Sequence, residues 1–260
     1  MKRFAYTFLF AIIYSFSFAQ VNNASVSLIP IPVSLQEGKG SFVLKNTTSI
    51  ELSVNDPDAR RVAGYLSKKL SMATGFSIPV KTTAPHDNII SLGITNNRSL
   101  GKEGYTLQVT TDHVKLEAND AAGLFYGMQS LILLLPKEIE SKSVISNIRW
   151  TIPSVSITDY PAFGWRGLML DVSRHFFTKQ DVEKFIDEMV KYKFNLLHLH
   201  LTDDQGWRIE IKSLPNLTKV GAWRPKREGA WSNTKAPDPS EPKTYGGFYT
   251  HEDIKELVQY

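Results

Sequence analysis

Gly167-Leu-Met-Leu-Asp-Val172 is the first of two apolar stretches that decide the fold of the second half of this 260-residue chain, and Phe194-Asn-Leu-Leu-His-Leu-His-Leu201 is the second. Each is a near-continuous apolar run, which is typical of a parallel strand covered on both faces. Between them, Thr178 is followed three residues later by Asp181, a pair that can bond the free backbone N–H groups at the start of a helix. We therefore predict a β-α-β unit over residues 166–201.

The residues around this unit extend the same pattern. Apolar side chains at helical spacing follow Thr178 and Asp181, as expected for a helix that begins there. Thr250 and Asp253 predict the start of a second helix, which has not ended at Tyr260. Two β/α units are too few to close a barrel, which needs about 250 residues. Either the sheet is small and open, or the sequence lacks its C-terminal part. The unfinished helix favours the second alternative.

The first half, residues 20–155, is predicted to be a separate α/β sandwich in which helices pack on a sheet. Alternating and β-branched patterns predict strands, at 41–44, 49–54, 88–93, 105–110 and 113–118. Apolar residues at helical spacing predict helices at 56–73 and 120–135, with Gly75 as a stop signal for the first. Gly123 and Gly127 lack the spacing and the lysine of a phosphate-binding loop, so we interpret them as packing positions.

The N-terminus has the layout of a secretory signal peptide. Lys2 and Arg3 precede an uncharged, mostly apolar stretch, and Ser17 and Ala19 provide the small side chains required before a cleavage site. A retained membrane anchor is the alternative, but the apolar stretch is shorter than the ~20 residues that span a bilayer. We expect residues 1–19 to be removed from an exported protein, with no membrane span afterwards.

Composition excludes several classes of protein. The chain has no cysteine, so disulfides, thiolate nucleophiles, cysteine-based zinc sites and iron–sulfur clusters are excluded. The absence of cysteine suits a bacterial periplasm or exterior better than a eukaryotic lumen. The net charge of +4 is small and no cluster of lysine and arginine stands out, so nucleic acid is not expected as a partner.

Charged residues follow both predicted strands, where β/α folds place their working residues. Asp171 and Arg174 end the first strand, and Asp203 and Asp204 end the second. An arginine here is a fixed fork of donors for sugar hydroxyls or carboxylates. Two alternatives stay open: Arg174 and Asp171 form a structural ion pair, or the two aspartates cap a loop through backbone amides.

Histidines and tryptophans in this half also have two interpretations. His198 and His200 lie two apart on a strand and so share a face, which is a metal-binding geometry as well as a core position; because no third ligand is recognisable, we predict no metal. Flat indole faces suit the apolar face of a sugar ring, although each one alone is better explained by packing. The tryptophans of this half are Trp165, Trp207, Trp223 and Trp231.

Taken together, these segments resemble the β-N-acetylhexosaminidases of glycoside hydrolase family 20. The resemblance rests on the runs 165–177 and 192–210, and continues through 211–224 and 245–250. Upstream, residues 29–32 and 123–130 are similar to the small N-terminal α/β domain of that family. The resemblance implies that residues 156–260 are the beginning of a (β/α)8 barrel that is truncated here. It also implies that the parent enzyme releases terminal β-linked N-acetylglucosamine or N-acetylgalactosamine from oligosaccharides or glycoconjugates, and that it needs no cofactor.

The resemblance also implies roles for single residues. Arg174 matches the arginine that holds hydroxyls of the terminal sugar, and Asp203 matches the aspartate that supports the acid catalyst together with a histidine. Arg166, Asp171 and Asp204 fall in the same motifs, with structural roles.

The mechanism implied is substrate-assisted retention, in which the acetamido group of the substrate attacks the anomeric carbon while an adjacent Asp-Glu pair assists. No Asp-Glu dipeptide follows the second strand, and Glu252-Asp253 has the reverse order. We therefore expect this chain alone to be inactive. Two other hypotheses remain: an exported protein that binds glycans without catalysis, and a metal-dependent hydrolase that uses His198 and His200.

Overall fold

The computed structural model describes residues 26–83, 87–95, 97–226 and 238–260. The predicted export signal, residues 1–19, and Trp231 lie outside this part of the chain. Among the described residues, no helix combines the length and the apolar character that crossing a membrane requires.

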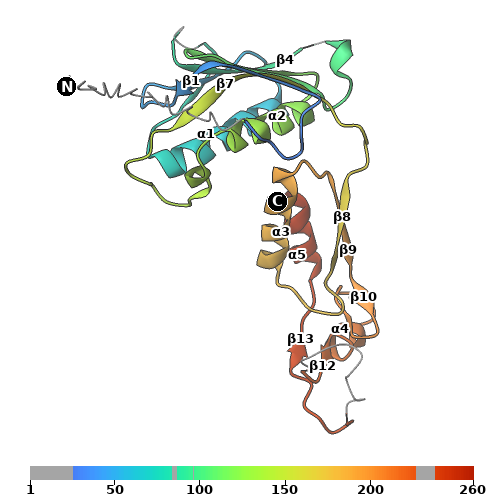
Figure 1. The fold of residues 1–260 in the computed structure, drawn as a ribbon. Helices are drawn as coiled ribbons and strands as arrows, with labels where there is room; N and C mark the ends of the chain where they lie inside the picture. The colour runs from blue at the N-terminus through green and yellow to red at the C-terminus, as the bar shows by residue number, and fades with distance from the viewer. Residues whose placement is uncertain (1–25, 84–86, 96, 227–237) are drawn as a thin grey trace, which may run out of the picture.

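The first domain is a seven-stranded sheet with two helices packed against it (Figure 1). The sheet order is β1-β7-β5-β6-β4-β2-β3, in which β3, β2, β4 and β6 run parallel and β5, β7 and β1 alternate in direction. The strands are β1 (Ser34–Val43), β2 (Ser49–Leu52), β3 (Val80–Lys81), β4 (Ile89–Ile94), β5 (Tyr105–Val109), β6 (His113–Ala118) and β7 (Thr151–Asp159). The helices are α1 (Pro57–Thr74) and α2 (Ala121–Leu133), with short 3-10 turns η1 (Arg98–Leu100) and η2 (Lys137–Glu140).

An aspartate side chain begins each of these two helices, and the predicted stop signal, Gly75, ends the first. The carboxylate of Asp56 accepts the N–H of Ala59 at the start of α1, and that of Asp120 accepts the N–H of Gly123 at the start of α2. Gly75 ends α1 with φ 74°, a left-handed conformation in which glycine has no steric penalty. The strands predicted at 105–110 and 113–118 are also confirmed, and they pair with each other as the antiparallel strands β5 and β6.

Strand β7 was not predicted and moves the end of the first domain. It pairs with β1 on one side and with β5 on the other as far as Asp159. The predicted boundary between residues 155 and 156 therefore falls inside a strand of the first sheet. Pro153 lies within the run that pairs with β1, opposite Ser41.

Two glycines inside helices of the first domain predict opposite effects of an added methyl group. A Cβ on Gly127 would lie 2.3 Å from Leu116 Cδ1 and 2.8 Å from the Tyr105 ring, whereas a Cβ on Gly64 would meet nothing within 4 Å. Gly127→Ala is expected to lower the free energy of unfolding by about 1–3 kcal/mol through overpacking. Gly64→Ala is expected to raise it by about 0.5–1 kcal/mol. Urea unfolding checks both, and equal effects would contradict the packing argument.

The second domain is built on two parallel strands, as the sequence predicts. Strand β8 (Gly167–Asp171) pairs in parallel with β9 (Leu196–His200), and α3 (Lys179–Lys191) connects them. Helix α5 (His251–Gln259) follows after a long loop region. Both helices begin with the capping arrangement predicted at Thr178 and Thr250. The loop region contains β10 (Thr202–Asp203), β11 (Gly206–Trp207), α4 (Asn216–Lys219), β12 (Trp223–Arg224) and β13 (Tyr245–Gly246).

Only one face of the β8–β9 pair is covered, so the expectation of strands buried on both faces is wrong for the described chain. Leu170, Leu197 and Leu199 pack with Val182 of α3 and with residues of α5. On the opposite face, Met169 has 56% of its surface exposed. The two helices of this domain lie on the same side of the strands, so nothing in the described chain covers the other side.

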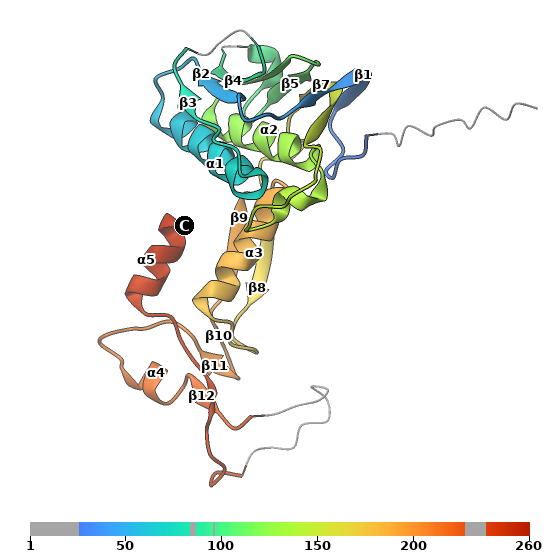
Figure 2. The ribbon, with the colours of Figure 1, turned by 90° about the vertical axis from the view of Figure 1, so that its left-hand side faces the viewer.

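A buried polar network joins the two domains. Lys193, in the turn before β9, donates from Nζ to Asp159 Oδ2 at 2.8 Å and to the Tyr105 hydroxyl at 2.9 Å. Nearby, Arg166 donates to the carboxylate of Glu103 at 2.8 Å and from Nε to the carbonyl of Lys193 at 2.8 Å. These contacts hold the amino ends of β8 and β9 against the first domain, so the carboxyl ends point away from it (Figures 1 and 2).

Candidate functional site

The carboxyl ends of β8 and β9 bring four polar side chains together. In the register of the two strands, Asp171 lies opposite His200. Both belong to the strand face that α3 and α5 leave uncovered, because side chains alternate along a strand and Leu170 and Leu199 face the helices. Arg174 and Asp203 follow directly on the two chain segments that leave the strands.

Arg174 lies at the centre of this cluster. Its Nη1 is 2.8 Å from Asp171 Oδ2 and its Nη2 is 2.8 Å from Asp203 Oδ2. The same Nη1 is 3.1 Å from His200 Nδ1, and His200 Nε2 is 3.1 Å from Asp203 Oδ2. Because a guanidinium only donates, Nδ1 of His200 accepts and its Nε2 carries the hydrogen. The two residues singled out from the sequence, Arg174 and Asp203, are thus in direct contact.

The turn after β8 explains how Arg174 reaches this position. Asp171 Oδ1 accepts the backbone N–H groups of Ser173 at 3.0 Å and Arg174 at 3.1 Å, which folds the chain back at the strand end. The hydroxyl of Ser173 donates to the carbonyl of Gly206 at 2.7 Å. The segment after β8 is therefore fastened to the segment after β9, and the guanidinium is delivered beside the second aspartate.

The cluster is both preorganised and open. Burial raises the pKa of Asp171, but the hydrogen bonds from the Arg174 and Ser173 amides and from the Arg174 side chain outweigh it and hold that pKa below its ordinary value. The side chain of Arg174 is 38% exposed and that of Asp203 is 25% exposed. A fixed guanidinium between two carboxylates that solvent can still reach can donate hydrogen bonds to a polar ligand.

The lowered pKa of Asp171 predicts how acid affects the protein. A carboxyl with a folded-state pKa below its unfolded value stabilises the protein above the unfolded pKa, about 3.9, and loses that effect as pH falls through the folded value. The melting temperature of wild type is therefore expected to exceed that of Asp171→Asn at pH 6. The difference is expected to shrink as the pH falls below the unfolded-state pKa and towards the lower folded-state value. Thermal unfolding over a series of pH values measures this, and a difference that stays constant would contradict the lowered pKa of Asp171.

The other predicted residues fall at different places. The N–H of Asp204 donates to Asp203 Oδ1 at 2.8 Å, so Asp203 both caps its own loop and contacts Arg174. Trp165 is 80% exposed at the amino end of β8, the end opposite Arg174. The indole N–H of Trp207 donates to the carbonyl of Ile209 at 2.6 Å. Trp165 therefore lies away from Arg174, whereas Trp207 is paired with Thr202, the residue before Asp203.

The histidine pair does not form a metal site with its neighbours. Within the described ranges, no group of three or more His, Cys, Asp or Glu side chains is arranged to hold a metal ion. Both ring nitrogens of His200 face groups of this chain, and one of these is the Arg174 guanidinium, whose charge repels a cation.

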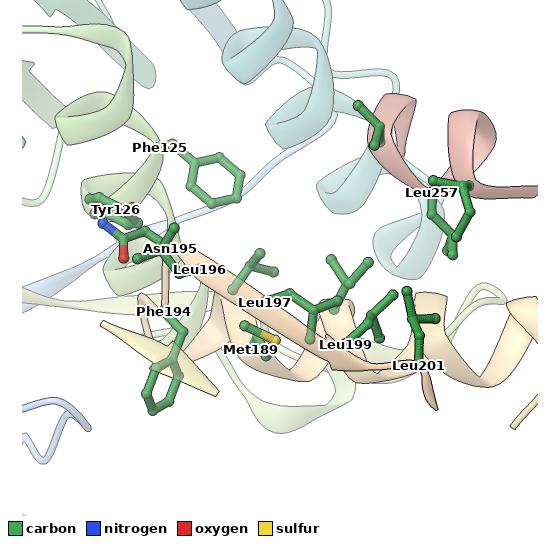
Figure 3. A pocket seen from close by; sticks show the side chains of 14 residues that line it. Phe125, Tyr126, Met189, Phe194, Asn195, Leu196, Leu197, Leu199, Leu201 and Leu257 are labelled. Carbon is green, nitrogen blue, oxygen red and sulfur yellow. The ribbon is translucent and has the colours of Figure 1, made fainter. Parts of the chain in front are cut away.

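An apolar groove of about 660 Å³ lies on the other side of β9, between that strand and helices α2, α3 and α5. Leu197, Leu199, Leu201 and Leu257 line it (Figure 3). Since residues 198 and 200 point the other way, the groove and the Arg174 cluster lie on opposite faces of β9. The groove therefore forms no part of the candidate site.

Sequence reasoning missed the part that His200 plays between Arg174 and Asp203, and it missed Arg208. The signal for His200 is its register opposite Asp171, which only the pairing of the strands reveals. Arg208 has a signal in the sequence: a lone charge between Trp207 and Ile209. Its side chain is completely buried.

The chain matches two models of one known protein family. Residues 25–160 match the model of glycosyl hydrolase family 20, domain 2, and residues 163–260 match that of the glycosyl hydrolase family 20 catalytic domain. The chain belongs to glycosyl hydrolase family 20. These matches confirm the resemblance to family 20 that the sequence indicated. They also confirm the predicted α/β fold, in which the second domain corresponds to the first part of the catalytic domain.

Relatives of this family-20 chain are β-hexosaminidases. One from Porphyromonas gingivalis is 39% identical over 236 residues, which cover 90% of this chain and 28% of that protein. The structure of the family-20 β-N-acetylhexosaminidase from Streptomyces coelicolor is similar with a TM-score of 0.77 and 37% identity, covering 90% of this chain and 43% of that one. A mutant Streptomyces plicatus β-hexosaminidase in complex with the product GlcNAc is similar with a TM-score of 0.76, 38% identity and the same coverage. The chain spans less than half the length of these relatives.

Proposed function

We propose that this chain carries the sugar-holding part of a β-N-acetylhexosaminidase site. The observation that supports it is the contact of Arg174 with Asp171, His200 and Asp203 at two neighbouring strand ends of a family-20 chain. Three donated hydrogen bonds fix the plane of the guanidinium, which has five N–H groups. The remaining two donate to hydroxyls of the terminal N-acetylhexosamine of an oligosaccharide or glycoconjugate.

The reaction proposed for the whole protein is hydrolysis with retention, assisted by the substrate's own acetamido group. In it, the oxygen of that group attacks the anomeric carbon and the bond to the leaving oxygen breaks as that oxygen gains a proton. Residues of this chain hold the sugar for this step. Asp203 supports the group that delivers the proton, and the relative from Streptomyces plicatus, bound to GlcNAc, supports the substrate class.

The 260-residue chain alone is proposed to be inactive. No Asp-Glu pair follows β9 in the sequence, and such a pair is what the proposed reaction needs for the acetamido group and the leaving oxygen. Here "whole protein" means the protein expressed from its own gene, including any sequence after Tyr260.

A chromogenic N-acetyl-β-glucosaminide tests both statements. The whole protein is expected to release the chromophore, and a polypeptide that stops at Tyr260 is expected to give the blank rate. Turnover by the shorter polypeptide would refute its inactivity. A whole protein that binds chitooligosaccharides without hydrolysing them would instead support glycan binding without catalysis.

Export is part of the proposal. The basic, apolar and small-residue segments of positions 1–19 support cleavage after Ala19 and delivery to a bacterial periplasm or to the exterior. Amino-terminal sequencing of the protein recovered from periplasmic and medium fractions tests it. A mature protein that begins at Met1 would refute it.

A further inference from the structure

Arg208 is a buried charge that pairs with backbone instead of a carboxylate. The residue is 0% exposed. Its six hydrogen bonds within the described chain all go to carbonyl oxygens, among them Ser173 O at 2.8 Å from Nη2 and Ala222 O at 2.5 Å from Nη1. The other four join the carbonyls of Val172, Ser173, Gln205 and Gly247. A buried charge is tolerated only when its donors are satisfied, and here carbonyl dipoles supply the acceptors.

The carbonyls that Arg208 binds come from four separate segments. Ser173 directly precedes Arg174, and Gln205 follows the loop of Asp203. Ala222 and Gly247 flank the short strands β12 and β13. One guanidinium therefore joins both strand-end segments that form the candidate site to the two loops beyond them.

The backbone around Arg208 is shaped to admit its guanidinium. A Cβ on Gly206 would lie 2.3 Å from Arg208 Cζ, and a Cβ on Gly247 would lie 2.3 Å from the ring of Phe176. That ring is in turn 5.7 Å from Arg208 Cζ. Two glycines and the ring of Phe176 thus enclose the planar guanidinium of Arg208. The single ammonium of a lysine cannot make the same set of hydrogen bonds.

A second arginine, Arg224, holds the backbone of Arg174 itself. Arg224 donates from Nη2 to the carbonyl of Arg174 at 2.9 Å, and its Cζ lies 4.7 Å from the centre of the Tyr245 ring. The hydroxyl of Tyr245 accepts the N–H of Phe176 at 3.2 Å. The backbone on both sides of Arg174 is therefore held from outside the candidate site.

We propose that Arg208, together with Arg224, is a positioning residue of the sugar site: it fixes the loops so that the side chains of Arg174 and Asp203 meet. This rests on the proposed function, since the effect on catalysis presupposes that Arg174 binds sugar. Neither arginine of the pair touches the substrate. Their effect reaches the substrate through the backbone of residues 172–174 and through Gln205.

Arg166 provides a matched control. It also donates to carbonyls, to Lys193 O at 2.8 Å and to Phe163 O at 2.7 Å, and to the carboxylate of Glu103. It lies at the amino end of β8, however, whereas the loops joined by Arg208 lie at the carboxyl end. Arg166→Lys therefore reports the cost of losing a bonded guanidinium without disturbing the rim that carries Arg174.

The experiment compares Arg208→Lys with Arg166→Lys in the whole protein. Both are expected to lower the melting temperature. Only Arg208→Lys is expected to lower kcat/KM for the chromogenic N-acetyl-β-glucosaminide, by about 10-fold or more, because small misplacement of a binding group is costly. Only Arg208→Lys is expected to speed hydrogen exchange at the Ser173 and Arg174 amides. Equal effects of the two variants on kcat/KM and on these amides would overturn the proposal.

Two further arms keep the outcome decisive. If Arg208→Lys does not fold, Arg224→Lys replaces it in the experiment, because it removes the hydrogen bond from Arg224 to the carbonyl of Arg174. This variant is expected to lower kcat/KM several-fold with little change in melting temperature. A kcat/KM equal to that of wild type would overturn the proposal. If wild type has no hexosaminidase activity, the proposed function fails, and the exchange of the two amides alone decides whether Arg208 positions the loops.

Discussion

Replacing Arg174 with methionine is expected to lower kcat/KM of the whole protein by about 1000-fold on a chromogenic N-acetyl-β-glucosaminide, since removal of even one positioned donor commonly costs 100- to 1000-fold. The change removes every N–H that the proposal directs at sugar hydroxyls. It also leaves Asp171 and Asp203 without the cation that lies between them, 2.8 Å from each. Steady-state kinetics at saturating and limiting substrate measure the loss.

Lysine at this position tests whether the planar fork matters beyond its charge. Arg174→Lys keeps the positive charge but cannot contact both carboxylates and two hydroxyls in one plane, so it is still expected to lose about 100-fold. Arg98→Lys in the exposed 3-10 turn of the first domain is the control and is expected to stay within about twofold of wild type. An Arg174→Lys enzyme as active as the control would remove Arg174 from the site.

The elements of the fold were predictable where short-range signals agree. Thr178 and Thr250 each carry an acidic partner three residues on, and both begin helices. Apolar runs at 167–172 and 194–201 became the parallel pair β8 and β9. Strand β7 was not predicted, although Val155 and Ile157 alternate with polar residues, because Pro153 interrupts the pattern near its start; its pairing with β1 and β5 shows the strand.

The candidate site was predictable only in part. Arg174 and Asp203 were identified from strand ends, but their contact depends on the register of β8 and β9 and on the turn that Asp171 stabilises. The buried Arg208 depends on four segments far apart in the sequence. No periodicity encodes such a convergence, because each segment alone resembles an ordinary loop.

Replacing Lys193 with methionine is expected to destabilise the 260-residue chain by about 3–5 kcal/mol, the usual cost of leaving one partner of a buried ion pair alone. The Lys193 side chain is 9% exposed and that of Asp159 is 13% exposed, with 2.8 Å between Nζ and Oδ2. Burial lowers the pKa of Lys193, and the ion pair with Asp159 opposes this. Without the ammonium, the donors that the described residues still offer to the Asp159 carboxylate are the Tyr105 hydroxyl, at 3.0 Å, and the N–H of Val33, at 3.3 Å.

Urea unfolding followed by tryptophan fluorescence measures this loss, and two further variants identify its cause. Lys115→Met removes an ion pair with Glu117 whose side chains are 50% and 33% exposed, and it is expected to cost about 0–1 kcal/mol. Adding Asp159→Asn to Lys193→Met is expected to recover part of the loss, because the stranded charge is then gone. If the double variant is no more stable than Lys193→Met, the loss comes from packing and not from an unpaired carboxylate.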